Sequence, residues 1–268
     1  SAVLADRLKK LANRSERAVG NNMYANMVEQ PLEKPASDLA EFQAARDAKI
    51  AEIKAARCPN CVAEALKTLE ESCTCGKGGQ VLHTAEAFEA QAVLSDVWSK
   101  LDAIGGACDI TVEPLNAHRW TEQFEALRKT TEAYMAKTGD NVKVFLANMG
   151  PIPQHKPRAD FSTGFFEVAH FDVLKNNGFQ TVEEAADAAL ASGADAAVIC
   201  STDATYPEIV PALAKLIKAK CPNMTVFLAG APAPEFKQSY VDAGVDEFIH
   251  VKANCLQILT ALQKKKGM

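Results

Sequence analysis

The sequence predicts an α/β protein with a doubly wound, five-stranded parallel sheet in its C-terminal half and a mainly helical region before it. Two observations carry this prediction. From residue 140 onward, short β-branched apolar runs alternate with helix-length stretches whose apolar residues recur at helical spacing. In residues 28–139 the periodic stretches are almost all helical, and prolines and glycines separate them.

Residues 1–27 predict one helix and one short strand. Three leucines are spaced along one helical face, and a strand is expected near Met23 and Tyr24 (the leucines are Leu4, Leu8 and Leu11). A piece this short cannot bury a core of its own, so we expect it to dock on the rest of the chain or on a larger body. Because Ser1 is not an initiator residue, we expect a preceding segment.

Residues 28–139 predict a helical linker region. Two prolines in residues 28–35 indicate a linker, and a capping box of Asp38 and Glu41 then begins a helix. Further helices are predicted at about 62–72, 84–103 and 121–137. We expect the following apolar residues to face inward: Leu39, Phe42, Ile50, Ile53, Val62, Leu66, Leu69, Leu94, Trp98, Leu101, Phe124, Leu127, Tyr134 and Met135.

Residues 140–268 contain five strand–helix units, which predict a flavodoxin-like domain. A long loop, residues 148–158, is expected between the first strand and a helix at 159–169, facing the ligand crevice. A capping box of Thr181 and Glu184 begins the second helix, and the third is expected to start near Glu208. The strands are predicted at 142–146, 171–174, 196–200, 225–229 and 247–251.

The overall composition excludes some classes of binding partner and indicates the cellular compartment. The net charge of −5 argues against nucleic acid or an anionic membrane as a partner, because both require a basic face. No apolar run approaches the ~18 residues that a membrane-spanning helix needs. Eight scattered cysteines in a chain of this size indicate a reducing, cytoplasmic compartment rather than a disulfide framework.

The domain from residue 140 resembles the cobalamin-binding domain of the methylmalonyl-CoA mutase family in four segments: VFLANMG, SGADAAVICST, TVFLAGAPAPEF and DAGVDEFI. The preceding stretch WTEQFEALRKTTEAY is similar to the corresponding segment of the family's small, non-catalytic subunit. The first residues, RAVGNNMYANMVEQPLE, resemble the end of that subunit's TIM barrel, and the helices between resemble its interdomain linker.

This resemblance implies a function for the whole assembly. The family's holoenzyme interconverts methylmalonyl-CoA and succinyl-CoA by an adenosylcobalamin-dependent radical rearrangement. The chain would then be the C-terminal part of the small subunit, with no catalytic residue of its own. It would form a heterodimer with a catalytic large subunit that holds the adenosylcobalamin, and it would not bind a cofactor itself.

The sequence departs from the family's cobalamin motifs at each contact element. Members that bind cobalamin have an Asp-x-His-x-x-Gly loop after the first strand, and here those three positions hold Ile152, Gln154 and Pro157. A buried imidazole ligand needs a partner that orients it, and glycines allow a bulky ligand to approach the backbone. The resemblance therefore implies a degenerate crevice, formed by Gly150, Ile152, Gln154, His155, Pro157, Ser201, Ala229, Gly230, His250 and Lys252.

Two alternatives remain open. The domain could be a corrinoid carrier that binds its ligand base-on, without a histidine; His155, one residue past the ligand position, is expected to be an exposed loop residue. The second alternative is a metal or redox module at Cys58, Cys61, Cys73 and Cys75. A helix of about 11 residues would hold the two pairs roughly 16–18 Å apart, too far for one zinc ion with bonds of about 2.3 Å. Each pair could instead form a labile local disulfide.

Overall fold

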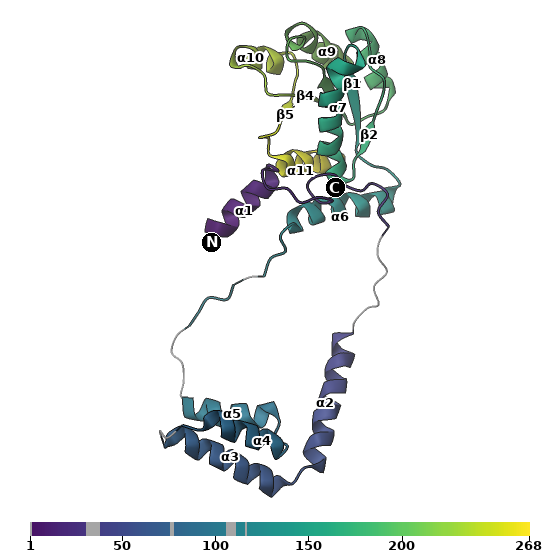
Figure 1. The fold of residues 1–268 in the computed structure, drawn as a ribbon. Helices are drawn as coiled ribbons and strands as arrows, with labels where there is room; N and C mark the ends of the chain where they lie inside the picture. Colours follow the sequence, from purple (N-terminus) through teal and green to yellow (C-terminus); the bar gives the residue numbers. More distant parts are fainter. Residues whose placement is uncertain (1, 31–37, 76–77, 106–110, 116) are drawn as a thin grey trace. The chain divides into compact units, whose positions relative to one another are not determined.

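The computed structural model describes residues 2–30, 38–75, 78–105, 111–115 and 117–268 (Figure 1). The chain divides into two compact units. The sheet unit combines residues up to 30 with residues from 117 onward, and the helical unit lies between them in the sequence.

The sheet unit contains a five-stranded parallel sheet with the strand order β2-β1-β3-β4-β5. This confirms the predicted α/β, flavodoxin-like fold, in which the order reverses beside β1. The strands are β1 (Lys143–Asn148), β2 (Asp172–Leu174), β3 (Ala196–Cys200), β4 (Thr225–Ala229) and β5 (Glu247–Ile249).

Helices cover both faces of this sheet (Figure 1). On one face, apolar side chains from α8 (Val182–Ala191), α9 (Tyr206–Lys220) and α10 (Pro234–Asp242) form one core with the strands. On the other, α6 (Glu122–Thr138), α7 (Ile152–Phe166) and α11 (Cys255–Lys266) form a second core. A 3₁₀ turn, Glu167–Ala169, follows α7. Residues of β1, β3 and β4 are almost all buried because both faces are covered.

Most predicted boundaries in this unit are close to the observed ones. The capping box of Thr181 and Glu184 is present at the start of α8. The third helix, α9, begins at Tyr206 rather than near Glu208, with Pro207 in its first turn. A proline is tolerated there because the first N–H groups of a helix have no intrahelical partner.

The N-terminal segment packs on the sheet unit through α1 (Ala2–Ala12) and the residues after it. Arg14 donates a hydrogen bond to the Gly164 carbonyl (3.2 Å), and its guanidinium lies 5.1 Å from the ring centre of Phe165. The strand predicted near Met23 and Tyr24 is wrong: this region contains only an isolated bridge between Val19 and Met23. A single bridge is not a strand, because the residues next to Val19 and Met23 do not continue the pairing.

The helical unit contains α2 (Leu39–Ala56), α3 (Pro59–Thr74), α4 (Gln80–Glu89) and α5 (Leu94–Gly105). The prediction of a single helix at 84–103 is wrong. The helix is interrupted between α4 and α5, where Gln91 has a φ of 67°. The unit's core is small and consists of Val62, Leu69, Ala87, Ala92 and Val97. No helix in the described ranges is both long and apolar enough to cross a membrane.

Several inward-facing predictions in the helical unit are also wrong. Leu39 and Phe42 of α2 are 76% and 66% exposed, and α2 has no buried residue. Leu94 and Trp98 of α5 are exposed as well, because α5 turns Val97 rather than Trp98 toward the core. Helical periodicity identifies an apolar stripe, but it does not supply the surface that would cover it.

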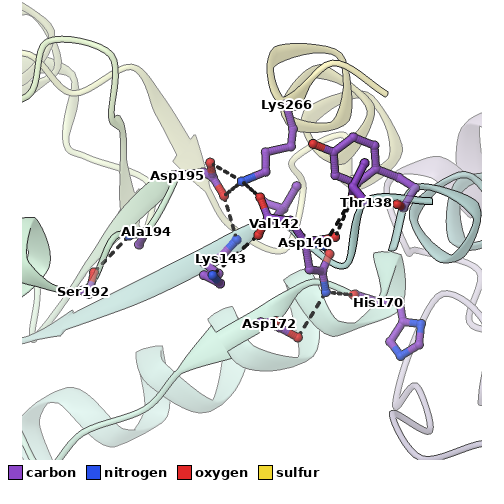
Figure 2. A network of polar contacts seen from close by, with 12 residues as sticks. Thr138, Asp140, Val142, Lys143, His170, Asp172, Ser192, Ala194, Asp195 and Lys266 are labelled. Carbon is purple, nitrogen blue, oxygen red and sulfur yellow. Dashed lines mark hydrogen bonds and ion pairs between the residues drawn. The ribbon is translucent and has the colours of Figure 1, made fainter. Parts of the chain in front are cut away.

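A polar network ties the amino ends of the strands to α11 (Figure 2). Lys266 forms ion pairs with Asp140 (2.8 Å) and Asp195 (2.9 Å), and Asp195 also accepts the Lys143 N–H (2.9 Å). The hydrogen bond from Lys266 holds the pKa of Asp140 at about 2. The network lies at the edge of the sheet opposite the expected ligand crevice, and we assign it a structural role.

Candidate functional site

The turn between β1 and α7 forms the first part of the candidate site. Gly150 has a positive φ of 79°, and α7 begins two residues later at Ile152. The long loop predicted for residues 148–158 is therefore wrong. Pro151 is the N-cap of α7 and Pro153 lies in its first turn, where a missing N–H costs no helical hydrogen bond.

The short turn gives His155 a different environment from the one predicted. His155 is 3% exposed, so the expectation of an exposed loop histidine is wrong. Its ring Nδ1 lies 3.0 Å from the Gly150 carbonyl oxygen, which makes Nδ1 the protonated nitrogen. A Cβ at Gly178 would lie 2.6 Å from the ring carbon Cε1, so the ring packs directly against that glycine. The imidazole thus holds the turn together.

An asparagine that the sequence analysis missed lies beside this histidine. Asn148 is 2% exposed and donates from Nδ2 to the Asn176 carbonyl (3.3 Å). Its Oδ1 is buried and has no hydrogen-bond partner among the described residues. Asn148, His155 and Tyr24 line a cavity of about 540 Å³. The sequence could have pointed to Asn148, because it is a polar residue at the end of an otherwise apolar strand.

The ends of β3 and β4 are joined by a buried tyrosine. The Tyr206 hydroxyl accepts a hydrogen bond from the Ser201 N–H (3.1 Å) and donates one to the Ala229 carbonyl (2.7 Å). Burial raises the pKa of Tyr206, so the phenol keeps its proton and can donate. Tyr206 therefore lies across the carboxyl ends of two central strands, where doubly wound proteins bind ligands.

Arg158 of α7 lies beside Tyr206 at the same strand ends. A Cβ at Gly230 would lie 3.4 Å from Tyr206 and 3.6 Å from the Arg158 guanidinium, so both side chains contact this position. Arg158 also forms an ion pair with Asp203 (2.9 Å). Neither Tyr206 nor Arg158 was singled out from the sequence, because only the fold brings α7 and α9 to the same strand ends.

The last two predicted residues lie elsewhere. His250 and Lys252 follow β5 and line a separate cavity of about 490 Å³ with residues of α11. Burial lowers the pKa of His250, and its Nδ1 accepts the Lys252 N–H (3.2 Å). The structure brings the other predicted residues together in two groups. One is the β1–α7 segment, with Gly150, Ile152, Gln154, His155 and Pro157; the other is the β3–β4 edge, with Ser201, Ala229 and Gly230.

The clustered cysteines lie at opposite ends of α3, as the spacing predicts. Cys58 is the N-cap and Cys75 the C-cap of this 16-residue helix. In the part of the chain that the structure describes, no group of three or more His, Cys, Asp or Glu side chains is arranged to hold a metal ion. The Cys58 and Cys61 sulfurs are 2.8 Å apart.

Comparison with known proteins gives consistent matches. The family model described as methylmalonyl-CoA mutase matches residues 1–107. The methylmalonyl-CoA mutase small subunit of Porphyromonas gingivalis is 37% identical over 161 residues, which cover 60% of this chain and 25% of that protein. The small subunit of Streptomyces virginiae is 33% identical over 150 residues, covering 56% and 23%.

A longer but weaker match extends over most of the chain. The methylmalonyl-CoA mutase of Rhizobium meliloti is 25% identical over 245 residues, which cover 88% of this chain and 34% of that protein. The chain thus spans about a quarter of the length of the small subunits that it matches. Together with the five-stranded parallel sheet, these matches show that the chain belongs to the methylmalonyl-CoA mutase family.

Proposed function

We propose that this chain is part of a non-catalytic, structural small subunit of a cytoplasmic, adenosylcobalamin-dependent methylmalonyl-CoA mutase. The holoenzyme would isomerise methylmalonyl-CoA and succinyl-CoA on its catalytic large subunit. In this proposal residues 1–27 are the end of a barrel, residues 28–139 a linker region, and residues 140–268 a cobalamin-binding-like domain.

The observation that carries the proposal is the filled carboxyl edge of the sheet. The residues there do not fit adenosylcobalamin: Tyr206 and Arg158 lie over the ends of β3 and β4. The position for a cobalt ligand is also unsuited, because Gln154 replaces the histidine of the family motif. His155, next to it, is buried in α7 and donates to a backbone carbonyl instead of lying on an extended loop.

The partner supports a direct test. The relatives named small subunits imply a large subunit, and we expect this chain to bind it without cobalamin of its own. The purified chain is mixed with a cobalamin-loaded catalytic large subunit and run on a size-exclusion column. Co-elution with all cobalamin remaining in the large subunit supports the proposal. Separate elution at micromolar concentrations contradicts the partnership.

A second candidate function rests on the cavity beside His155. The buried Asn148 Oδ1, unpartnered among the described residues, and the cavity of about 540 Å³ favour a bound small molecule. The candidate is a corrinoid held base-on, a mode that needs no histidine ligand and is atypical for the family. Equilibrium dialysis of the chain against hydroxocobalamin, followed by absorbance spectra of the bound fraction, separates the candidates. A bound base-on spectrum would establish the carrier, whereas a base-off spectrum would implicate His155 as a ligand. An absence of bound hydroxocobalamin supports the structural subunit.

A further inference from the structure

The helical unit carries a dithiol at the start of α3, in the sequence Cys58-Pro59-Asn60-Cys61. The Cys61 N–H donates to the Cys58 sulfur (3.4 Å), and the Cys61 sulfur lies 2.8 Å from it. Both cysteines are exposed. The two sulfurs are about 0.8 Å farther apart than in a disulfide bond of about 2.05 Å, so a bond can form with little movement.

The two thiols are not equivalent. The hydrogen bond from Cys61 lowers the pKa of Cys58, and its interaction with Cys58 raises the pKa of Cys61. Glu64, one turn along α3, opposes part of this effect by raising the pKa of Cys58. The N-terminal end of a helix stabilises a negative charge on the N-cap sulfur. Cys58 is therefore the stronger nucleophile at neutral pH. Once Cys58 has formed a mixed disulfide, Cys61 is close enough to attack the Cys58 sulfur.

The other described cysteines lack this arrangement. Cys73 packs against the small core of the helical unit, and Cys75 donates to the Ser72 carbonyl (3.5 Å) at the C-terminal end of the same helix. Burial raises the pKa of Cys200 and of Cys255 to about 12. Among the cysteines in the described ranges, only Cys58 and Cys61 have sulfurs that contact each other.

We propose that Cys58 and Cys61 form a thiol–disulfide exchange site whose substrates are exposed, low-molecular-weight disulfides of the glutathione type. The Cys58 thiolate attacks one sulfur of the small disulfide, the S–S bond breaks, and the released thiolate takes a proton. Cys61 then loses its proton and attacks the Cys58 sulfur, and a second thiol leaves. The chain loses two electrons and two protons, and one small disulfide becomes two thiols.

The test uses the full chain in buffers of graded reduced and oxidised glutathione, followed by acid quenching, alkylation and peptide mass spectrometry. We expect an intrachain disulfide within the peptide that holds Cys58 and Cys61. In the Cys61→Ser variant, Cys58 should accumulate as a mixed disulfide with glutathione. In the Cys58→Ser variant, Cys61 should be modified several-fold less. Before oxidation, iodoacetamide should alkylate Cys58 several-fold faster than Cys61 at neutral pH, because their hydrogen bond lowers the pKa of Cys58 and raises the pKa of Cys61.

The matched control is the double variant Cys73→Ser/Cys75→Ser, which alters the other end of the same helix and should leave the disulfide unchanged. All four positions lie at the surface or at its margin, so the variants should fold. The proposal is overturned if excess oxidised glutathione gives no disulfide between Cys58 and Cys61. It is also overturned if the Cys73 and Cys75 pair oxidises equally, or if both Cys58 and Cys61 are protected by zinc and released by a chelator.

Discussion

The sheet unit and the helical unit bury their apolar residues to very different extents. In the sheet unit, large side chains are fully buried on both faces of the sheet, such as Leu213 and Leu228 on one face and Phe166 on the other. The helical unit has a core of five residues, and α2 contributes none of them. The difference shows that an apolar stripe becomes a core only where a second apolar surface covers it.

The largest expected difference comes from truncating matched leucines. Leu228→Ala should lower the free energy of unfolding by about 2–5 kcal/mol, because it leaves a cavity in the packed sheet core. Leu39→Ala on exposed α2 should change it by less than about 0.5 kcal/mol. Urea unfolding followed by Trp120 fluorescence in a Trp98→Phe background measures the effect of Leu228→Ala on the sheet unit. Trp98 fluorescence in a Trp120→Phe background measures the effect of Leu39→Ala on the helical unit. Equal effects of the two changes would refute the contrast in burial.

A smaller effect is expected at the filled crevice. Tyr206→Phe removes the hydroxyl that pairs with the Ser201 N–H and the Ala229 carbonyl, and it leaves both groups buried. The expected cost is about 1–3 kcal/mol. Tyr134→Phe is the control, since Tyr134 is only partly buried in α6 and, among the described residues, its backbone carbonyl rather than its hydroxyl pairs with Thr138. If thermal unfolding gives the two variants the same midpoint, Tyr206 does not hold the strand ends together.

The two units also contain lysine ion pairs of different exposure. Lys266→Met should cost about 1–2 kcal/mol, because Asp140 and Asp195 lose a partly buried, hydrogen-bonded cation. Lys100→Met in the helical unit should cost less than about 1 kcal/mol, because its pair with Glu70 is nearly half exposed. Chemical denaturation of both variants gives the comparison, and a larger loss for Lys100→Met would contradict it.

The same network predicts a dependence on pH. Asp140 has a pKa of about 2 in the folded chain, below its ordinary value of 3.8. Its contribution to stability is therefore present above about pH 4 and is lost as the pH falls toward 2. Unfolding midpoints between pH 5 and pH 2 should fall more steeply for the unmodified chain than for Asp140→Asn. Parallel curves would show that Asp140 is not held by Lys266.

The smallest effect is expected on the exposed face of the helical unit. Phe42→Ser should change the stability of the isolated chain by less than about 0.5 kcal/mol, since Phe42 is 66% exposed. Circular dichroism during thermal unfolding measures this directly. A loss above about 1 kcal/mol would mean that α2 packs against another surface in solution.

The sequence predicted the sheet well and the crevice only partly, for physical reasons. Strands such as 196–200 and 225–229 are continuous apolar runs between turn residues, and their bounds match the structure. The prolines at 151 and 153 suggested a loop, yet they are compatible with the first turn of α7. Tyr206 and Arg158 escaped notice because they come from helices that only the folded sheet brings together.

The most direct test of the central claim is equilibrium dialysis of the full chain against adenosylcobalamin, with the catalytic large subunit as the positive control. A filled crevice predicts no bound cobalamin at micromolar concentrations of the chain, while the large subunit binds one equivalent. Stoichiometric cobalamin on this chain alone would contradict the account, because Tyr206 and Arg158 could not then occupy the ligand crevice.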